Sequence, residues 1–290
     1  MDGRKVRRLA TVLVASQLRA GRGTTDPRKF TGRPIALLVL DVVAFAGAFL
    51  LGYGVLSAAE GSDPAFVAST AAQAAPFLPL LVLGGVMIAG VMFELTGSGR
   101  FATSDAVNWL PVTTEEYVLG SALAISFSDS VIAAFSSALA LAFALVTGEY
   151  IAFGLAAALC CVALVEGGFL VEILRAVTQR ASAVVAGRAG RATIVLRAAV
   201  FLAVVLSFQL FFNPIFLLDL LRSLSAVSAV AAFVPFLWGS YAVGQAESGA
   251  WLLAGGFAAL QVSLVGGLFL LATRVRGRYW APPADRKSVV

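Results

Sequence analysis

The chain has 290 residues, of which 60% are hydrophobic and only 13% are charged, and its mean hydropathy is +0.92. A soluble domain carries about one-quarter charged residues, so this composition excludes an ordinary soluble globular protein. A bilayer core about 30 Å thick is crossed by roughly 20 apolar helical residues, and apolar runs of that length recur along the chain. The composition therefore predicts an all-α, polytopic membrane protein.

The residue types also disfavour several functions. Histidine is absent, so bis-His haem ligation, His-ligated zinc and Ser-His or Cys-His catalysis have no imidazole to use. The cysteines, Cys160 and Cys161, are adjacent in an apolar run, and we expect lipid-facing or packing residues rather than a disulfide or metal pair. We expect no catalytic residue, no bound cofactor, no metal site and no nucleic-acid partner.

Residues 1–33 form the first expected segment, a cytoplasmic amphipathic helix with a linker. Val6, Leu9, Leu13 and Leu18 approximate one helical stripe, and arginines occupy the positions between them. Such a pattern is typical of a basic helix lying on the inner membrane surface. The alternative is a partly ordered basic tail. Pro and Gly residues in the linker 23–34 break any continuing helix before the first span.

A six-span transmembrane domain is expected over residues 34–272. In hydrocarbon every backbone amide must bond within its own segment, so the apolar runs are predicted to be helices, and their lack of alternation does not fit a barrel. The predicted spans are 34–57, 76–93, 119–146, 150–171, 193–217 and 250–272.

The loop 94–118, between the second and third spans, carries the signals of a helix start. Thr113 or Thr114 can cap a helix whose first turn contains Glu115 and Glu116, where negative charge complements the helix dipole. A capped cytoplasmic helix joined directly to a span is an element through which a soluble partner can push on a membrane domain. The alternative is the ordinary capped start of a span.

Acidic residues inside spans are costly and mark candidate sites. The sequence places Asp41 in the first span, Asp129 in the third and Glu166 in the fourth, with Glu172 at the interface. Asp41, Asp129 and Glu166 form a possible intramembrane polar site for a proton or a substrate cation. The alternative is that they are hydrogen-bonded packing residues, since no intramembrane Lys or Arg is an obvious partner.

Residues 218–249 are expected to form an external segment before the last span. The stretch 223–243 is apolar and long enough to span, so seven spans are possible. A seventh span would place the basic tail, residues 273–290, outside, which the orientation rule disfavours. We therefore expect an external helical hairpin, broken near Pro235.

Lys and Arg then set the orientation, because cytoplasmic flanks carry their excess. With six spans and both termini in the cytoplasm, every one of the 21 Lys and Arg residues except Arg222 lies on the cytoplasmic side. The expected location is the cell (plasma or inner) membrane.

At the loop, residues 110–120 read LPVTTEEYVLG, which resembles the Leu-Pro-Val-Ser-x-x-Glu-Tyr-Val-Leu-Gly-Lys pattern of ABC-2 type transporter permeases. That family also has an amphipathic helix before the first span and an external helical stretch before the last one. Ser121 stands where a basic residue is common. The resemblance covers the layout of the whole chain but only about a dozen residues of motif.

The resemblance implies a coupling region that docks on an ATPase, made by Asn108, Trp109, Leu110, Pro111, Val112, Thr113, Thr114, Glu115, Glu116 and Tyr117. The phosphate-binding pattern GxxxxGK[ST] is absent, so ATP and Mg would be held by a partner. The implied partners are an ABC ATPase subunit in two copies, a second permease copy or homologous half, and membrane lipids. The implied function is export of a lipid, drug-like or polysaccharide-type substrate by a subunit that is not itself an enzyme.

Two other functions stay open from the residues alone. One is a proton- or ion-coupled secondary transporter that uses Asp129 or Glu166. The other is a non-transporting membrane subunit that assembles a larger complex. The sequence leaves open the substrate, the choice between homodimer and heterodimer, and a longer parent chain with two permease halves.

Overall fold

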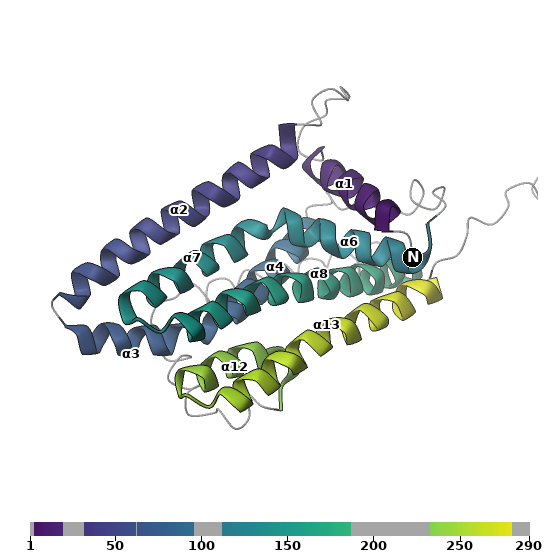
Figure 1. The fold of residues 1–290 in the computed structure, drawn as a ribbon. Helices are drawn as coiled ribbons and strands as arrows, with labels where there is room; N and C mark the ends of the chain where they lie inside the picture. Colours follow the sequence, from purple (N-terminus) through teal and green to yellow (C-terminus); the bar gives the residue numbers. More distant parts are fainter. Residues whose placement is uncertain (1–2, 20–31, 62, 96–111, 187–232, 280–290) are drawn as a thin grey trace, which may run out of the picture.

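A computed structural model describes residues 3–19, 32–61, 63–95, 112–186 and 233–279, and within these ranges the regular structure is helical (Figure 1). The helices are α1 (Gly3–Arg19), α2 (Gly32–Glu60), α3 (Pro64–Ala74), α4 (Phe77–Leu95), α6 (Thr114–Ser128), α7 (Ser130–Thr147), α8 (Tyr150–Ala186), the short 3-10 helix η3 (Pro235–Leu237), α12 (Trp238–Glu247) and α13 (Trp251–Tyr279).

Four of these helices are long and apolar enough to cross a membrane: α2, α7, α8 and α13. The helix α8 lies at the centre of the described bundle and packs against α4, α6, α7, α12 and α13. The helix α2 packs chiefly along α7, so most of its apolar surface is exposed. These features fit an all-helical membrane protein, as the sequence predicts.

A fifth crossing would come from α3 and α4 taken together, which meet at a bend of 46°. Asp63 caps α3 by accepting a hydrogen bond from the Phe66 amide at 3.0 Å, and Pro64 occupies the first turn. Pro76 follows the last turn of α3, and because proline has no amide hydrogen the helix is interrupted there. The predicted span 76–93 coincides with α4, whereas α3 was not predicted.

The predicted span 119–146 consists of two helices, α6 and α7, separated by Asp129. The Asp129 backbone has φ −104° and ψ 11°, outside the helical range, although its amide still bonds the Ile125 carbonyl at 3.0 Å. The start of α6 precedes the predicted span because the capped turn belongs to the same helix. The predicted fifth span, 193–217, and residues 223–232 lie outside the described residues.

Two glycines close the turns at one end of the bundle. Gly148 between α7 and α8 and Gly249 between α12 and α13 have φ of 79° and 78°. L side chains rarely adopt this left-handed conformation, so glycine is the residue that ends the helix there.

The end of the bundle that contains α3 and these two glycine turns is called the α3 end. The opposite end, where α1, the start of α6 and the last turns of α13 meet, is called the α1 end (Figure 1).

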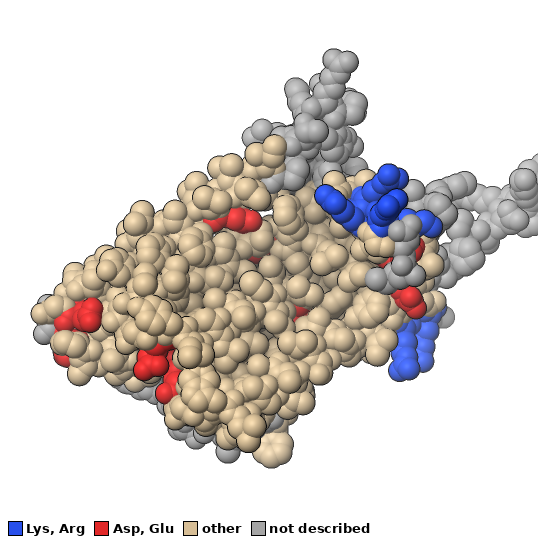
Figure 2. Space-filling model, in the orientation of Figure 1, with Lys and Arg blue, Asp and Glu red and all other residues tan. Residues whose placement is uncertain are grey.

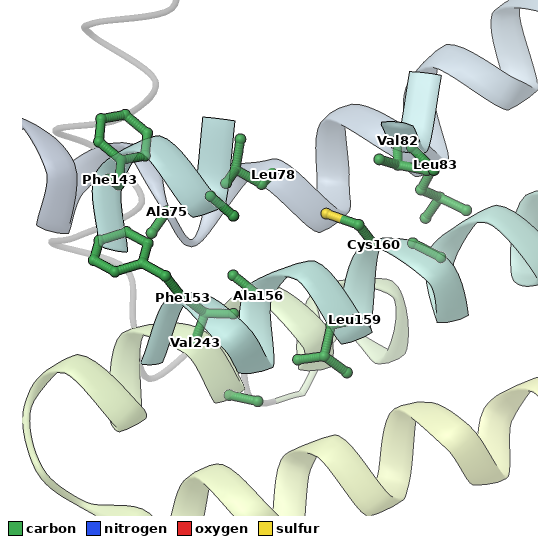
Figure 3. Close-up of a cluster of buried hydrophobic side chains, with 14 of the residues drawn as sticks. Ala75, Leu78, Val82, Leu83, Phe143, Phe153, Ala156, Leu159, Cys160 and Val243 are labelled. Atoms are coloured by element: carbon green, nitrogen blue, oxygen red, sulfur yellow. The ribbon is translucent and has the colours of Figure 1, made fainter. Parts of the chain in front are cut away.

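Each end has its own apolar core. At the α3 end, side chains of α4, α7, α8 and α12 pack together, among them the fully buried Val82 and the stacked rings of Phe143 and Phe153 (Figure 3). Cys160 belongs to this core, which confirms a packing role for it, whereas Cys161 is exposed. At the α1 end, Leu9 and Leu13 of α1 pack with Val118 of α6, Phe169 of α8 and Leu268 of α13.

Candidate functional site

The candidate site is the start of α6, and it is built on a capping box. The Thr113 hydroxyl accepts a hydrogen bond from the Glu116 amide at 3.2 Å, and the Glu116 carboxylate accepts one from the Thr113 amide at 3.2 Å. Two amides that the first turn leaves without helical partners are thereby satisfied. The predicted cap is confirmed at Thr113. Glu115 in the same turn is exposed, whereas Glu116 is buried.

One turn into α6, Tyr117 is linked to the last helix. Arg276 of α13 donates a hydrogen bond from its Nη2 to the Tyr117 hydroxyl at 3.1 Å. The Arg276 guanidinium carbon also lies 4.7 Å from the centroid of the Tyr117 ring, a cation–π arrangement. Tyr117 is 2% exposed and Arg276 7%, so this contact between α6 and α13 is shielded from solvent.

Glu172 of α8 completes the link. Its Oε2 accepts a hydrogen bond of 2.6 Å from the Ser121 hydroxyl of α6, and its Oε1 lies 3.8 Å from Arg276 Nε. Glu172 is 1% exposed, so its carboxylate is buried between the three helices. We call Tyr117, Ser121, Glu172 and Arg276 the Tyr117 cluster, which ties three helices together. Arg175, one turn beyond Glu172 on α8, is also buried.

The charges of this cluster influence the Tyr117 hydroxyl. Burial, reinforced by the nearby Glu172 carboxylate, raises the pKa of Tyr117 to about 12, although Arg276 and Arg175 act in the opposite direction. The phenol is therefore neutral at physiological pH and accepts the Arg276 hydrogen bond as a hydroxyl. The buried pair of Glu172 and Arg276 is costly to break, because a buried charge that loses a partner is not compensated by water. The relative positions of the three helices are fixed accordingly.

The helix α1 covers the other side of α6. At Gly120 a Cβ atom would stand 2.9 Å from Leu9 Cδ2, so α1 packs directly on the α6 backbone. Val6, Leu9, Leu13 and Val14 are all buried. Of the predicted stripe, Val6, Leu9 and Leu13 are therefore buried by protein, and the side chain of Leu18 lies outside the described ones.

A second buried polar link lies towards the middle of the bundle. Gln261 of α13 donates a hydrogen bond from Nε2 to Glu166 Oε2 of α8, and its Oε1 accepts one of 3.0 Å from the Gly239 amide. Gly239 is in the first turn of α12, where amides lack helical partners. Glu166 is fully buried, and among the described residues its Oε1 has no hydrogen-bond partner. Gln261 thus joins α8, α12 and α13.

The three acids predicted to form an intramembrane site are not gathered at one place. Asp41 of α2 accepts a hydrogen bond of 2.8 Å from the Ser130 hydroxyl, beside the α6–α7 break that contains Asp129. Glu166 lies instead in the seam between α8 and α13, held by Gln261. Within the described part of the chain no group of three or more Cys, Asp or Glu side chains is placed to hold a metal ion.

Sequence reasoning missed Gln261 and the role of Arg276. Gln261 is a polar residue in the middle of an apolar run, and this position could have marked it as a candidate site residue. Arg276 is one of several basic residues that follow the last predicted span, and nothing in the local sequence indicates its partners. Of the predicted coupling residues, Val112 to Tyr117 are described, and Asn108, Trp109, Leu110 and Pro111 lie outside the described residues.

Comparisons with protein-family models, curated proteins and solved structures found no match to this chain.

Proposed function

We propose that the chain is the transmembrane permease subunit of an ATP-binding cassette transporter of the ABC-2 type, exporting a lipid, drug-like or polysaccharide-type substrate. The observation that carries the proposal is the Tyr117 cluster. It links a capped helix start, in the segment whose sequence resembles the coupling loop of that family, to both α8 and α13. A force applied to the first turn of α6 would therefore reach two other helices directly.

The expected topology has six spans with both termini in the cytoplasm of the cell membrane. Support comes from the described Lys and Arg side chains, which belong to α1, the second half of α8 and the last turns of α13, all at the α1 end (Figure 2). The exposed acids Asp63 and Glu149 and the half-buried Glu60 occupy the opposite end. The positive-inside rule then makes the α1 end the cytoplasmic one.

The partners follow from the same proposal. ATP and Mg are held by a separate ATPase subunit, in two copies, and a second permease copy or homologous half completes the pathway. The exposed carboxylate of Glu115 lies next to the buried Glu116 and Tyr117, so a protein docked on the first turn of α6 would contact Glu115 while pressing on the cluster beneath it.

Co-purification from the native membrane tests this proposal. We expect an ABC ATPase to accompany the chain, ATP-dependent transport in reconstituted vesicles, and loss of both with Glu115→Lys. The matched control is Glu149→Lys, an exposed glutamate at the α3 end, which should leave both intact. The proposal fails when no ATPase accompanies the chain and transport is unaffected by Glu115→Lys.

A second function, a proton- or ion-coupled secondary transporter, is favoured by one observation: the fully buried Glu166 with one carboxyl oxygen unpartnered among the described residues. Transport that persists without ATP, stops when the proton or sodium gradient is collapsed, and is lost in Glu166→Gln would support this function over the first.

A further inference from the structure

The two faces of α1 differ in chemistry and in surroundings. One face consists of Val6, Leu9, Leu13 and Val14, all buried, and the last three belong to the core at the α1 end. The other carries Arg4, Lys5, Arg7 and Arg8, whose side chains are exposed, and we call it the basic face of α1. In Figure 2 these side chains form a compact blue group at the place that α1 occupies in Figure 1.

The packing of α1 on α6 determines what the basic face can reach. An amphipathic helix that uses its apolar side to enter lipid keeps its charges towards water. Here the apolar side is occupied by protein, with Leu9 against Gly120, so the charged side is the one presented to the surroundings of the bundle.

Those surroundings include apolar surface at the same end. The helix α1 contacts α2, in which Ile35 and Leu38 near the start of the helix are 62% and 57% exposed. Val12 of α1 itself is 60% exposed and lies beside the basic positions. Cations that border exposed apolar side chains at the end of a candidate span are typical of the headgroup region of a bilayer.

We propose that the basic face of α1 binds the phosphate groups of anionic lipids in the leaflet at the α1 end. Guanidinium groups match phosphate oxygens with paired hydrogen bonds, and each basic residue near an anionic surface strengthens binding about fivefold. The inference goes beyond the proposed transport function, because it requires neither an ATPase nor a substrate.

The experiment uses the purified full chain in phosphatidylcholine vesicles that contain a trace of spin-labelled phosphatidylglycerol or spin-labelled phosphatidylcholine. Electron paramagnetic resonance gives the fraction of each label immobilised by the protein, and their ratio is the preference for the anionic lipid. Two double variants are compared. The α1 pair combines Arg7→Gln and Arg8→Gln, and the α13 pair combines Arg274→Gln and Arg278→Gln. The second pair removes the same charge from exposed positions on α13 at the same end.

We expect the wild-type chain to prefer phosphatidylglycerol and the preference to fall in high salt. The α1 pair should weaken binding at the occupied site by up to roughly 30-fold, and the α13 pair by much less. The proposal is overturned if the α1 pair keeps the wild-type preference for phosphatidylglycerol. It is also overturned if both pairs lose this preference equally, because the net charge of the protein would then explain the lipid preference. Loss of a co-purifying protein with an unchanged lipid preference also overturns it and assigns the face to a protein partner. If a variant fails to fold, the wild-type chain still tests the proposal, because a wild-type chain that shows no preference for phosphatidylglycerol at low salt overturns it.

Discussion

The two ends of the bundle are held together by different means. At the α1 end, buried charged and polar side chains of α6, α8 and α13 bond one another across the core. At the α3 end, the packed core is apolar, the helices turn at left-handed glycines, and α3 meets α4 at a bend. Directional bonds fix the register of neighbouring helices, whereas the hydrophobic effect is non-directional and specifies register only through the shapes of the packed side chains. The comparison predicts that the α1 end, where directional bonds add to an apolar core, is the more rigid of the two.

Removing the Arg276 side-chain charge should have the largest effect on this comparison. Arg276→Met removes both the 3.8 Å contact with the buried Glu172 carboxylate and the hydrogen bond to the Tyr117 hydroxyl, and we expect a loss of about 3 kcal/mol in the free energy of unfolding. Thermal unfolding in lipid nanodiscs measures it. Arg278→Met, an exposed arginine on the same helix, is the control. Equal stability of the two variants would contradict the role given to the cluster.

Overpacking the seam between α6 and α8 should have a smaller effect. A Cβ atom at Gly168 would stand 2.7 Å from the Ala122 carbonyl oxygen, so Gly168→Ala should cost about 2 kcal/mol by separating the two helices. Gly154 lies on the same helix with no atom within 4 Å of its Cβ position. Gly154→Ala should therefore be neutral or stabilising in the same unfolding measurement, and a similar loss in both would argue against close packing as the cause.

The cap of α6 is expected to contribute less. Thr113→Ala removes the acceptor for the Glu116 amide and should cost about 1 kcal/mol, whereas Thr113→Ser keeps the hydroxyl and should stay close to wild type. Hydrogen exchange at the first turn of α6 reports the local loss directly. Unchanged protection in Thr113→Ala would show that the cluster alone holds the helix start.

The smallest expected effect on stability concerns Glu247 at the α3 end. Glu247 is the last residue of α12 and lies outside the predicted spans. Burial, with Glu149 nearby, raises the pKa of Glu247 from 4.5 to about 8. The folded state therefore keeps a proton that the unfolded state releases, so the contribution to stability is full below pH 4.5 and is lost as the pH rises towards 8. Glu247→Gln should flatten this part of the unfolding profile by a modest amount, since the side chain is partly exposed. A profile identical to wild type would contradict the shift.

The sequence predicts the elements of this fold better than their connections. The apolar runs 34–57, 150–171 and 250–272 correspond to α2, α8 and α13, because length and composition alone decide whether a helix can span a bilayer. The cap at Thr113 was predictable because it involves residues of one turn.

Long-range pairs were not predictable in this way. Ser121 and Glu172 are 51 positions apart and Tyr117 and Arg276 are 159 apart, so only the packing of the helices reveals them. The break at Asp129 was also missed, since no proline or glycine marks it. Gln261 could have been noticed as an isolated amide in an apolar run, but its two partners belong to distant helices.

The position of α1 also has a consequence for synthesis. Its apolar face packs on α6, and residues 20–113 separate the two helices in the chain. At roughly 5 to 20 residues per second, α1 leaves the ribosome about 5 to 20 s before its partner. During that interval four apolar side chains have no protein to cover them. The apolar face of the nascent helix must therefore be covered temporarily by another surface, such as the membrane or a chaperone. The basic residues of α1 favour binding to an anionic membrane during this interval.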